Sequence, residues 1–459
     1  MTENKQILKL QSIIKKNTGI DRAIGYVLLG RGFSVLAQPI TLYLIARYFT
    51  GVEQGFYYTF GSLLAISVFL ELGLGIVITQ FASHEYAYLR WKDDGGLDGE
   101  PKALSRLLSL MRKSLGWYGV ITVIYALLLI PIGIWFFSTS SDSFGVHYVM
   151  PWIILVIFSA AKLSVLPIQS VLEGCGRVAA VQRLILMQSV LGGIVVIVTI
   201  LSNGKLLAAS FLAISNFAIV SVWLWRNFKG FLVQIFATTK VALTHHIRWK
   251  TEILPMQWRI ALSWMSGYLI YQLFNPLLFK YQSPEIAGRM GMSLSLANMM
   301  QNVSIAWLST KVPLYGALIS KKDYKTLNQL FKKSTIQSLI VSIIISFAAI
   351  AAVWSILYLF PKYSSRILPV PSVAMLLFAN VINILIVSFA GYLRAHKEEP
   401  FLIPSLIGAA CTATAAWVCA KYFNANVLCA IIFVLNLTIG LPMAYYVFRK
   451  KQKDWNIVP

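Results

Sequence analysis

Twelve stretches of mostly apolar residues recur along the chain, and each approaches or exceeds the ~20 residues that a helix needs to cross a bilayer. Apolar residues run continuously within each stretch, which favours helices over the alternating strands of a membrane barrel. The pattern therefore predicts an all-α, polytopic membrane protein with about 12 transmembrane helices. The predicted spans are residues 23–47, 56–80, 113–137, 149–171, 179–201, 206–225, 260–280, 287–310, 335–360, 367–392, 401–420 and 426–448.

The connection between the sixth and seventh spans is one of the two longest, and it divides the spans into two groups of six. We therefore expect two six-helix lobes joined by a linker that is basic and carries apolar residues at helical spacing. The predicted domains are an amphipathic N-terminal segment at residues 1–22, a first lobe at 23–226, the linker at 227–258, a second lobe at 259–448 and a tail at 449–459.

A short sequence in the first lobe recurs in similar form in the second, and this internal echo favours a structural relation between the lobes. In the first lobe, a span with Gln38–Pro39 is followed by the sequence Gly51-Val-Glu-Gln-Gly55. In the second, a span with Asn275–Pro276 is followed by Ser283-Pro-Glu-Ile-Ala-Gly288. Halves with an even number of spans would be parallel repeats, related by a pseudo-two-fold axis along the membrane normal.

Positive charge is distributed unevenly between the two sides of the predicted membrane. The loops on one side hold 31 lysine and arginine residues, against 7 on the other. The positive-inside rule then places both termini and the linker in the cytoplasm. The same rule accounts for the net charge of +23 without a nucleic-acid partner. Residues 1–22 have basic positions around one apolar helix face, so we expect them to lie on anionic membrane lipids.

Composition excludes an ordinary soluble enzyme. Hydrophobic residues make up 58% of the chain and charged residues 12%, whereas soluble domains have roughly 45–50% and about 25%. Soluble-enzyme motifs and large extracytoplasmic loops are absent, so we predict neither catalytic residues nor an enzyme. The four cysteines form no metal-binding spacing, and we predict no metal site.

Three ionisable residues lie deep within predicted spans, where a charge is costly and is a functional hypothesis by default. Arg31 is in the first span, Glu71 in the second and Lys162 in the fourth. Ser34 and Gln38 share a helix face with Arg31, and such a polar stripe must face a wet cavity or another polar helix. Pairing of Glu71 with either base as structural glue remains an equal alternative.

The second lobe has polar but mostly uncharged spans. Gln272 is in the seventh span, and Asn298 and Asn302 interrupt the eighth. Amides and hydroxyls suit a polyhydroxylated ligand, but they equally suit hydrogen bonding between helices. The sign of the deep charges favours an anionic substrate, because Glu71 is the only acid among them. Phosphate and pyrophosphate match arginine well, which leaves Glu71 as counter-ion, proton carrier or sodium ligand.

The first hairpin resembles a known family of membrane proteins. Gly51-Val-Glu-Gln-Gly-Phe-Tyr-Tyr-Thr-Phe60, followed by Phe69-Leu-Glu-Leu-Gly-Leu-Gly75, is similar to the first hairpin of the polysaccharide biosynthesis (O-antigen-type) flippases. These belong to the superfamily that also contains multidrug extruders and lipid II flippases. The span number, the two lobes and the inter-lobe linker agree with this resemblance along nearly the whole chain.

The resemblance implies a flippase for an undecaprenyl-pyrophosphate-linked oligosaccharide in the inner membrane of a bacterium. It would carry the unit to the outer leaflet by alternating access, driven by a proton or sodium gradient and with no bound cofactor. A polysaccharide polymerase and other assembly proteins would be its partners. Basic residues in the family's early spans match Arg31 in kind. Lys162 rests instead on its own polar helix face, which it shares with Ser159, Gln169 and Glu173.

Two other functions remain open from the sequence. A drug or cation antiporter of the same fold would need acids in its spans, and Glu71 is the only deep one. A membrane-embedded polysaccharide polymerase or ligase would need a large external loop, and the sequence predicts none.

Overall fold

The computed structural model describes residues 22–92, 95–139, 145–237, 246–309, 311–320, 322–396 and 401–455. The predicted amphipathic N-terminal segment lies outside these residues except for Arg22, which begins the first described helix. Part of the linker and the last residues of the tail also lie outside them.

The first lobe consists of eight helices with a small hairpin of two antiparallel strands. Local sequence sets several helix ends: Thr50 and Glu53 form a reciprocal capping box at the start of α3, and Pro101 begins α6. The elements are α2 (Arg22–Tyr48), α3 (Gly51–Leu64), α4 (Ser67–Glu71), α5 (Leu74–Tyr86), β1 (Leu89–Trp91), β2 (Leu97–Gly99), α6 (Pro101–Ser138), α7 (Val149–Gly174), α8 (Val178–Leu201) and α9 (Leu207–Ala237).

The second lobe follows a five-residue π-helical turn. Asp323 caps α14 through the backbone N–H of Thr326, and Asn424 caps α17. The elements are η3 (Trp249–Ile253), α10 (Leu254–Tyr271), α11 (Phe274–Tyr281), α12 (Pro284–Ser309), α13 (Val312–Ser320), α14 (Tyr324–Leu359), η4 (Pro361–Ser365), α15 (Val370–Ala395), α16 (Leu402–Tyr422), α17 (Ala425–Leu435), η5 (Asn436–Gly440) and α18 (Leu441–Asp454).

Within the described residues, nine helices are long and apolar enough to cross a membrane. A tenth crossing is a broken one, in which the segment Gly51–Glu71 meets α5 at an angle of 47°. The two remaining predicted spans correspond to the pair α10–α11 and to α12, which are interrupted or more polar. The chain is therefore a multi-pass membrane protein, and its helices follow the predicted order of twelve.

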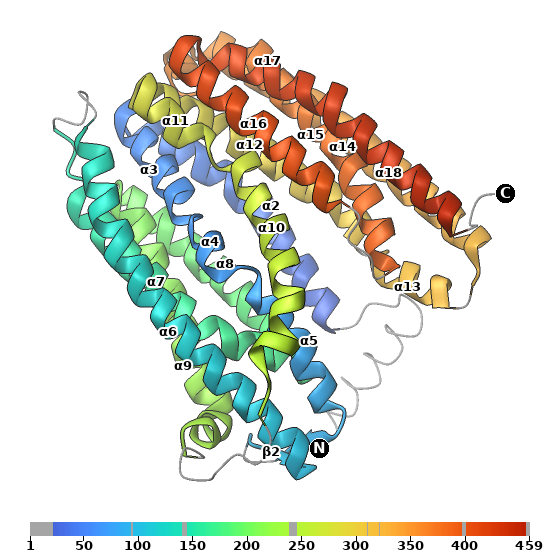
Figure 1. Ribbon diagram of the computed structural model, residues 1–459. Coiled ribbons are helices and arrows are strands. Elements are labelled where there is room, and N and C mark those ends of the chain that lie inside the picture. Colours follow the sequence, from blue (N-terminus) through green and yellow to red (C-terminus); the bar gives the residue numbers. More distant parts are fainter. Residues whose placement is uncertain are drawn as a thin grey trace, which may run out of the picture.

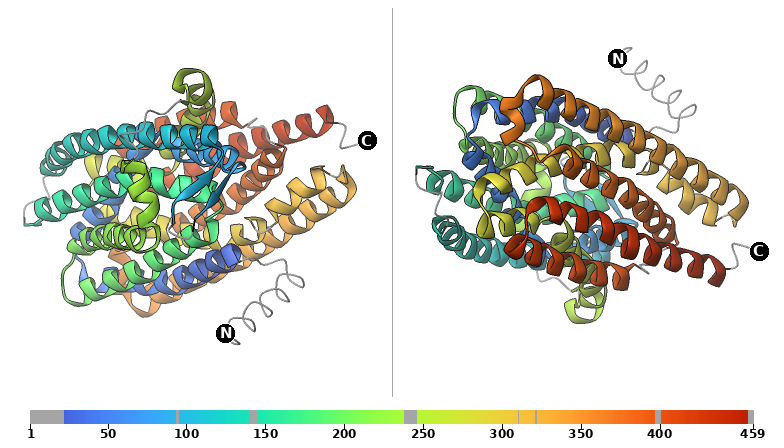
Figure 2. Two further views of the ribbon diagram at one scale, coloured as in Figure 1. Left: turned by 90° about the horizontal axis from the view of Figure 1, so that it is seen from below. Right: turned by 90° about the horizontal axis from the view of Figure 1, so that it is seen from above.

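The two lobes meet at one end and diverge at the other (Figure 1). They meet at the end that carries the short turns, near α3, α11 and α17, which we call the short-turn end. At the opposite, long-loop end, α13, the end of α18 and the β-hairpin lie far apart. Figure 2 shows the same divergence from below, with the ends of the second-lobe helices pointing away from the first lobe.

An aromatic cluster fills the core where the lobes meet. Phe56 of α3 contacts Phe279 of α11 edge to face, with ring centroids 4.9 Å apart. Phe137 of α6 lies 5.0 Å from Phe56 and 5.2 Å from Phe279. All three rings are fully buried or nearly so. Aromatic pairs at these distances contribute about 0.5–1.5 kcal/mol beyond the burial of their area, so the cluster joins the lobes by packing.

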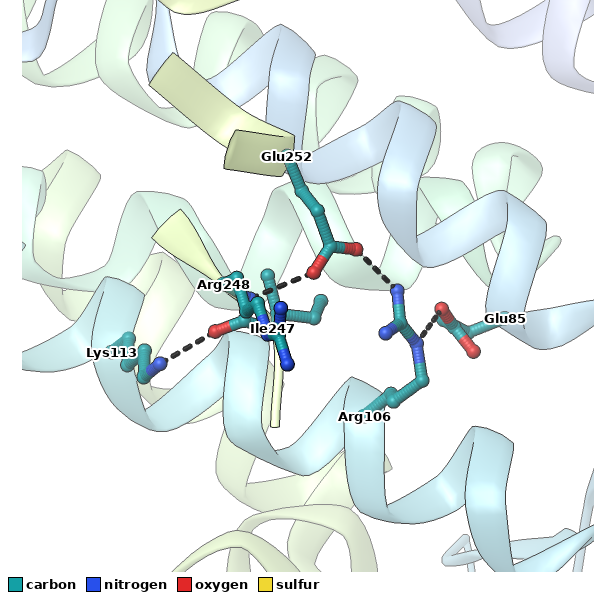
Figure 3. Close-up of polar contacts among 6 residues, drawn as sticks. All are labelled: Glu85, Arg106, Lys113, Ile247, Arg248 and Glu252. Atoms are coloured by element: carbon teal, nitrogen blue, oxygen red, sulfur yellow. Dashed lines mark hydrogen bonds and ion pairs between the residues drawn. The ribbon is translucent and has the colours of Figure 1, made fainter. Parts of the chain in front are cut away.

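The linker is held against the first lobe by an ion pair and a hydrogen bond (Figure 3). The Arg106 guanidinium on α6 lies between two carboxylates, 2.7 Å from Glu85 of α5 and 2.6 Å from Glu252 of η3. Lys113 donates to the backbone oxygen of Ile247 at 2.6 Å. The described end of the linker therefore belongs structurally to the first lobe, and the chain passes to the second lobe through α10.

Candidate functional site

A cavity of about 570 Å³ lies mainly within the first lobe, between α2, α3, α7, α8 and α9, and α12 of the second lobe contributes to its wall. Four of the predicted substrate-binding residues line it together: Ser34, Gln38, Lys162 and Asn298. The polar face of α2 and Lys162 of α7 thus line a common space, one of the two arrangements that such stripes allow. We call this space the polar cavity.

Lys162 gives the polar cavity its charge. Among the described lining residues it is the only one with a formal charge, and none of the ion pairs in the described part of the chain includes it. It lies near the middle of α7 and is half-buried. An anion that entered would therefore meet a single positive group in surroundings of low dielectric constant, where charge interactions are strong.

Uncharged polar groups complete the wall. The hydroxyls of Ser34 and Thr41 donate to carbonyls one turn back on α2, at 2.9 and 3.0 Å, which leaves their oxygens as acceptors for a ligand. Gln188 of α8 donates to the backbone oxygen of Asn216 on α9 at 3.0 Å. Tyr57 and Tyr58 of α3 add aromatic surface. Hydroxyls, amides and aromatic rings are suited to binding a sugar.

Three predicted residues do not line the polar cavity. Arg31 lies on α2 about one turn toward the long-loop end from Ser34. Asn302 is exposed one turn beyond Asn298, past the end of the cavity wall. Gln272 lies at the break between α10 and α11, away from the polar cavity. These three residues therefore lie outside the cavity wall, and their role in binding stays a prediction.

Glu71 lies at a break in a helix. It is the last residue of α4, and the backbone then turns through left-handed conformations at Leu72 (φ 52°) and Gly73 (φ 65°). Left-handed leucine is rare and costs about 1–3 kcal/mol, so the surroundings must hold the bend. A Cβ on Gly73 would overlap the Cγ2 of Ile260, which shows that α10 of the second lobe packs directly on this bend.

A tyrosine accompanies the Glu71 carboxylate. The hydroxyl of Tyr118 donates to its Oε1 at 3.3 Å, and none of the described ion pairs includes Glu71. The alternative in which Glu71 pairs with Lys162 is therefore absent from the described ion pairs. A Cβ on Gly75 would lie 3.2 Å from the Ser170 Oγ and 3.3 Å from the Glu71 Oε1. Both oxygens therefore lie close to the Gly75 backbone, which carries no side chain. We call this group the bend site.

The Gly51–Gly55 sequence forms the contact between the lobes at the short-turn end. A Cβ on Gly55 would overlap the carbonyl oxygen of Pro284 at the start of α12. Gln54 is buried and donates to the backbone oxygens of Gly288 and Arg366, at 2.8 and 2.7 Å. We call this contact the short-turn junction. The two echo sequences thus lie against each other, as expected where a pseudo-two-fold axis passes between equivalent elements.

A second, smaller cavity of about 330 Å³ lies within the second lobe, between α10, α15, α16 and η5. Tyr271 and Asn383 line it and share a hydrogen bond of 3.3 Å. The π-helical turn η5 forms part of its wall through Asn436 and Gly440. Both lobes therefore enclose space, but only the first-lobe cavity has a base near the middle of a span.

Sequence reasoning missed several wall residues of the polar cavity. Gln188 and Asn216 are single amides inside the fifth and sixth spans, and Ser189 adjoins the first of them. Their polarity inside apolar stretches was the available signal. It is weak because an isolated uncharged residue in a span costs little and often bonds only to a neighbouring helix.

Neither a family model nor a curated relative matches the sequence. Solved structures do match. An inward-facing multidrug resistance MATE family transporter of the MOP superfamily aligns over 94% of this chain and 99% of its own, with a TM-score of 0.62 and 12% identity. The MATE multidrug transporter DinF-BH, solved as a complex, aligns over 92% and 94%, with a TM-score of 0.58 and 15% identity. The chain has the MATE transporter fold.

A third structure has the same fold but is described differently. It is a MOP superfamily transporter from Pyrococcus furiosus whose binding pocket has reverse polarity, suggesting a different function. It aligns over 95% of this chain and 96% of its own, with a TM-score of 0.51 and 12% identity. At such identities the likeness establishes the two-lobed, twelve-helix architecture.

Proposed function

We propose that this protein is a bacterial inner-membrane transporter that moves an undecaprenyl-pyrophosphate-linked oligosaccharide to the outer leaflet by alternating access. One observation carries the proposal: the polar cavity has Lys162 as its charged residue and is otherwise lined by hydroxyls, amides and aromatic rings. Such a wall is complementary to an anionic glycan rather than to an organic cation.

The proposed transport cycle follows from the way the lobes meet. In this state the lobes are closed at the short-turn end and diverge at the long-loop end. With the long basic loops in the cytoplasm, as the charge bias predicts, a substrate would enter from the cytoplasmic leaflet and contact Lys162. Transport then requires the short-turn junction to separate while the long-loop ends approach each other.

Glu71 is the residue that we propose for coupling to a proton or sodium gradient. Its carboxylate lies at the bend on which α10 packs, so a change of its charge acts where one lobe touches the other. Tyr118 and Ser170 supply neighbouring oxygens for a proton or a sodium ion. Broken helices near the middle of the membrane provide such ion sites in transporters.

The test is deletion of the gene in its bacterium, followed by extraction of undecaprenyl-linked sugars. We expect the glycolipid to accumulate and surface polysaccharide to fall, with restoration by the wild-type gene. Lys162→Ala should restore neither, whereas Lys421→Ala, which removes an exposed lysine outside the polar cavity, should restore both. Normal polysaccharide in the deletion strain would refute the proposal, provided that no second copy of the gene is present.

Multidrug export is the second candidate, because the MATE structures reported above are described as multidrug transporters. The aromatic side chains of Phe33, Tyr57 and Tyr58 would suit a flat apolar drug. The two candidates separate on charge: a cationic dye should be exported better by Lys162→Ala than by the wild type, since the substitution removes a repelling group. Sensitivity of the deletion strain to such dyes, with unchanged glycolipid, would favour this function.

A further inference from the structure

An apolar groove of about 690 Å³ runs along the outside of the molecule between α2, α12 and α14, toward the short-turn end. Its lining on α14 includes three small side chains, Ala348, Ala349 and Ala352, among larger aliphatic ones, and α12 contributes Met292 and Met299. Small residues on membrane helices usually allow a second helix to approach. Here they leave a hollow instead, bordered by flexible methionines that adapt to an irregular ligand.

The groove and the polar cavity lie on adjacent faces of the same two helices. On α2, Ser34 and Gln38 face the cavity, whereas Tyr43 and Ala46 line the groove. On α12 the division runs between Asn298 and the methionines of the groove. Leu42 lines both spaces and is the side chain between them. A polar space thus adjoins an apolar one, as an amphiphile with a polar head and a long hydrocarbon chain requires.

Cations gather where the groove reaches the short-turn end. Lys362 lies in η4 and Arg366 directly follows it, and both residues line the groove. No ion pair in the described part of the chain includes either of them. Tyr43, a groove residue, accepts a hydrogen bond of 3.1 Å from Arg47. Positive groups at the end of an apolar groove are complementary to a phosphate whose hydrocarbon chain lies within it.

We propose that this groove binds the polyprenyl chain of the transported lipid after translocation, with its phosphate held by Lys362 and Arg366. The inference rests on the proposed function, which supplies a lipid-linked substrate. A glycerophospholipid of the bilayer would not need a sugar-binding cavity on an adjacent face of the same helices. The shared wall at Leu42 therefore favours the substrate lipid over an ordinary membrane lipid.

The test measures binding of undecaprenyl phosphate to the purified full-length protein in nanodiscs. Ala352→Trp fills the groove, and its control is Ala351→Trp, an exposed neighbour on α14 that does not line it. We expect Ala352→Trp to weaken binding at least tenfold and the control to leave it within twofold. Ala348→Trp, a second filling variant, guards against misfolding of the first, and thermal unfolding is measured for all three.

The headgroup is tested separately. The double variant Lys362→Gln/Arg366→Gln should weaken binding of undecaprenyl phosphate at least tenfold but leave undecaprenol binding unchanged. Lys421→Gln, at another short turn, is the charge control. Phosphatidylglycerol should compete poorly, and equal competition would make the groove an ordinary lipid site and overturn the proposal. Wild-type binding by both groove-filling variants would also overturn it.

Different results would contradict the groove assignment and the proposed function. If groove variants bind undecaprenyl phosphate normally while Lys162→Ala still blocks polysaccharide export, the groove assignment falls and the function stands. If wild-type protein does not prefer undecaprenyl phosphate to undecaprenol, and the deletion strain accumulates no glycolipid, the function falls together with the groove.

Discussion

The lobes touch at the short-turn junction and at the bend site, and the two contacts differ in kind. The junction is a contact between backbones: Gly55 meets the Pro284 carbonyl, and Gln54 bonds to two backbone oxygens of the second lobe. At the bend site, a side chain of α10 packs on Gly73 beside the carboxylate of Glu71. The first contact is therefore fixed by shape, whereas the second contains a group whose charge can change.

This difference suits an alternating-access transporter. A close contact between backbones, such as that of Gly55 with the Pro284 carbonyl, is either formed or broken. It therefore defines a conformational state of the molecule. A carboxylate beside a strained bend can shift the balance between such states, because protonation or ion binding changes its interactions locally. The predictions below test this division, beginning with the contact whose loss costs most.

The largest effect is expected from Gly55→Ala. The added Cβ would overlap the Pro284 carbonyl, and backbone atoms on both sides cannot move aside. Overpacking of this kind costs about 1–3 kcal/mol or more, so thermal unfolding in detergent should occur at a clearly lower temperature. Gly61→Ala on the same helix meets nothing within 4 Å and should be neutral or stabilising, since alanine is about 1 kcal/mol better in a helix.

A smaller loss is expected from Gln54→Ala. The change removes both hydrogen bonds across the junction and leaves the oxygens of Gly288 and Arg366 without this donor. Buried groups left unsatisfied cost about 1–3 kcal/mol. The control is Gln80→Ala, an exposed glutamine of α5, which should stay within about 0.5 kcal/mol. Equal unfolding temperatures for the two variants would contradict a role for Gln54 in closing the lobes.

At the bend site, Glu71→Gln should alter transport far more than stability. Glutamine keeps an oxygen that can accept from Tyr118 but cannot change its charge. We expect normal expression and unfolding temperature, with transport that no longer responds to the proton or sodium gradient. Gly75→Ala should act in the same direction, because its Cβ intrudes between Glu71 and Ser170. Gradient-driven transport by Glu71→Gln would exclude it as the coupling group.

Hydropathy predicted the order of the helices well and their ends less well. The first predicted span, 23–47, corresponds to α2, but α6 begins at Pro101 rather than near residue 113. The added turns carry polar residues such as Arg106 beyond the apolar stretch, so a hydropathy window does not include them. The break at Leu72 also had little sequence signal, because left-handed leucine depends on the packing around it.

The candidate site was predicted in part for a similar reason. Ser34, Gln38 and Lys162 repeat along helix faces, so periodicity placed them toward common polar surroundings, and the structure places them around one cavity. Gln272 was named only for its polarity within the seventh span, and a hydropathy pattern does not show the α10–α11 break at which it lies. Sequence reasoning also did not identify the role of Glu53. Its carboxylate caps α3 and pairs with Lys205 at 2.8 Å. The pair joins residues that are far apart in the chain, so only the fold identifies it.

The smallest effect concerns the linker, away from both lobe contacts. Arg106→Gln removes the two ion pairs that hold Glu252 and Glu85 together. Partly exposed pairs contribute about 0–1 kcal/mol each, so we expect faster proteolysis of the linker and little change in global unfolding. Arg90→Gln, which breaks an exposed pair of 3.6 Å with Asp98, is the control and should change neither.

Acid should release the linker in the same way. The backbone N–H of Arg248 and then the Arg106 guanidinium lower the pKa of Glu252 below its ordinary value, although burial opposes them. A carboxyl whose pKa is lower in the folded state stabilises that state above its ordinary pKa of about 4.3, and this contribution is lost as the pH falls through the lowered value. Linker proteolysis by an acid-active protease should therefore rise below about pH 4 in the wild type. In Glu252→Gln it should already be faster at neutral pH and less dependent on pH. An unchanged acid profile in that variant would contradict Glu252 as the group that holds the linker.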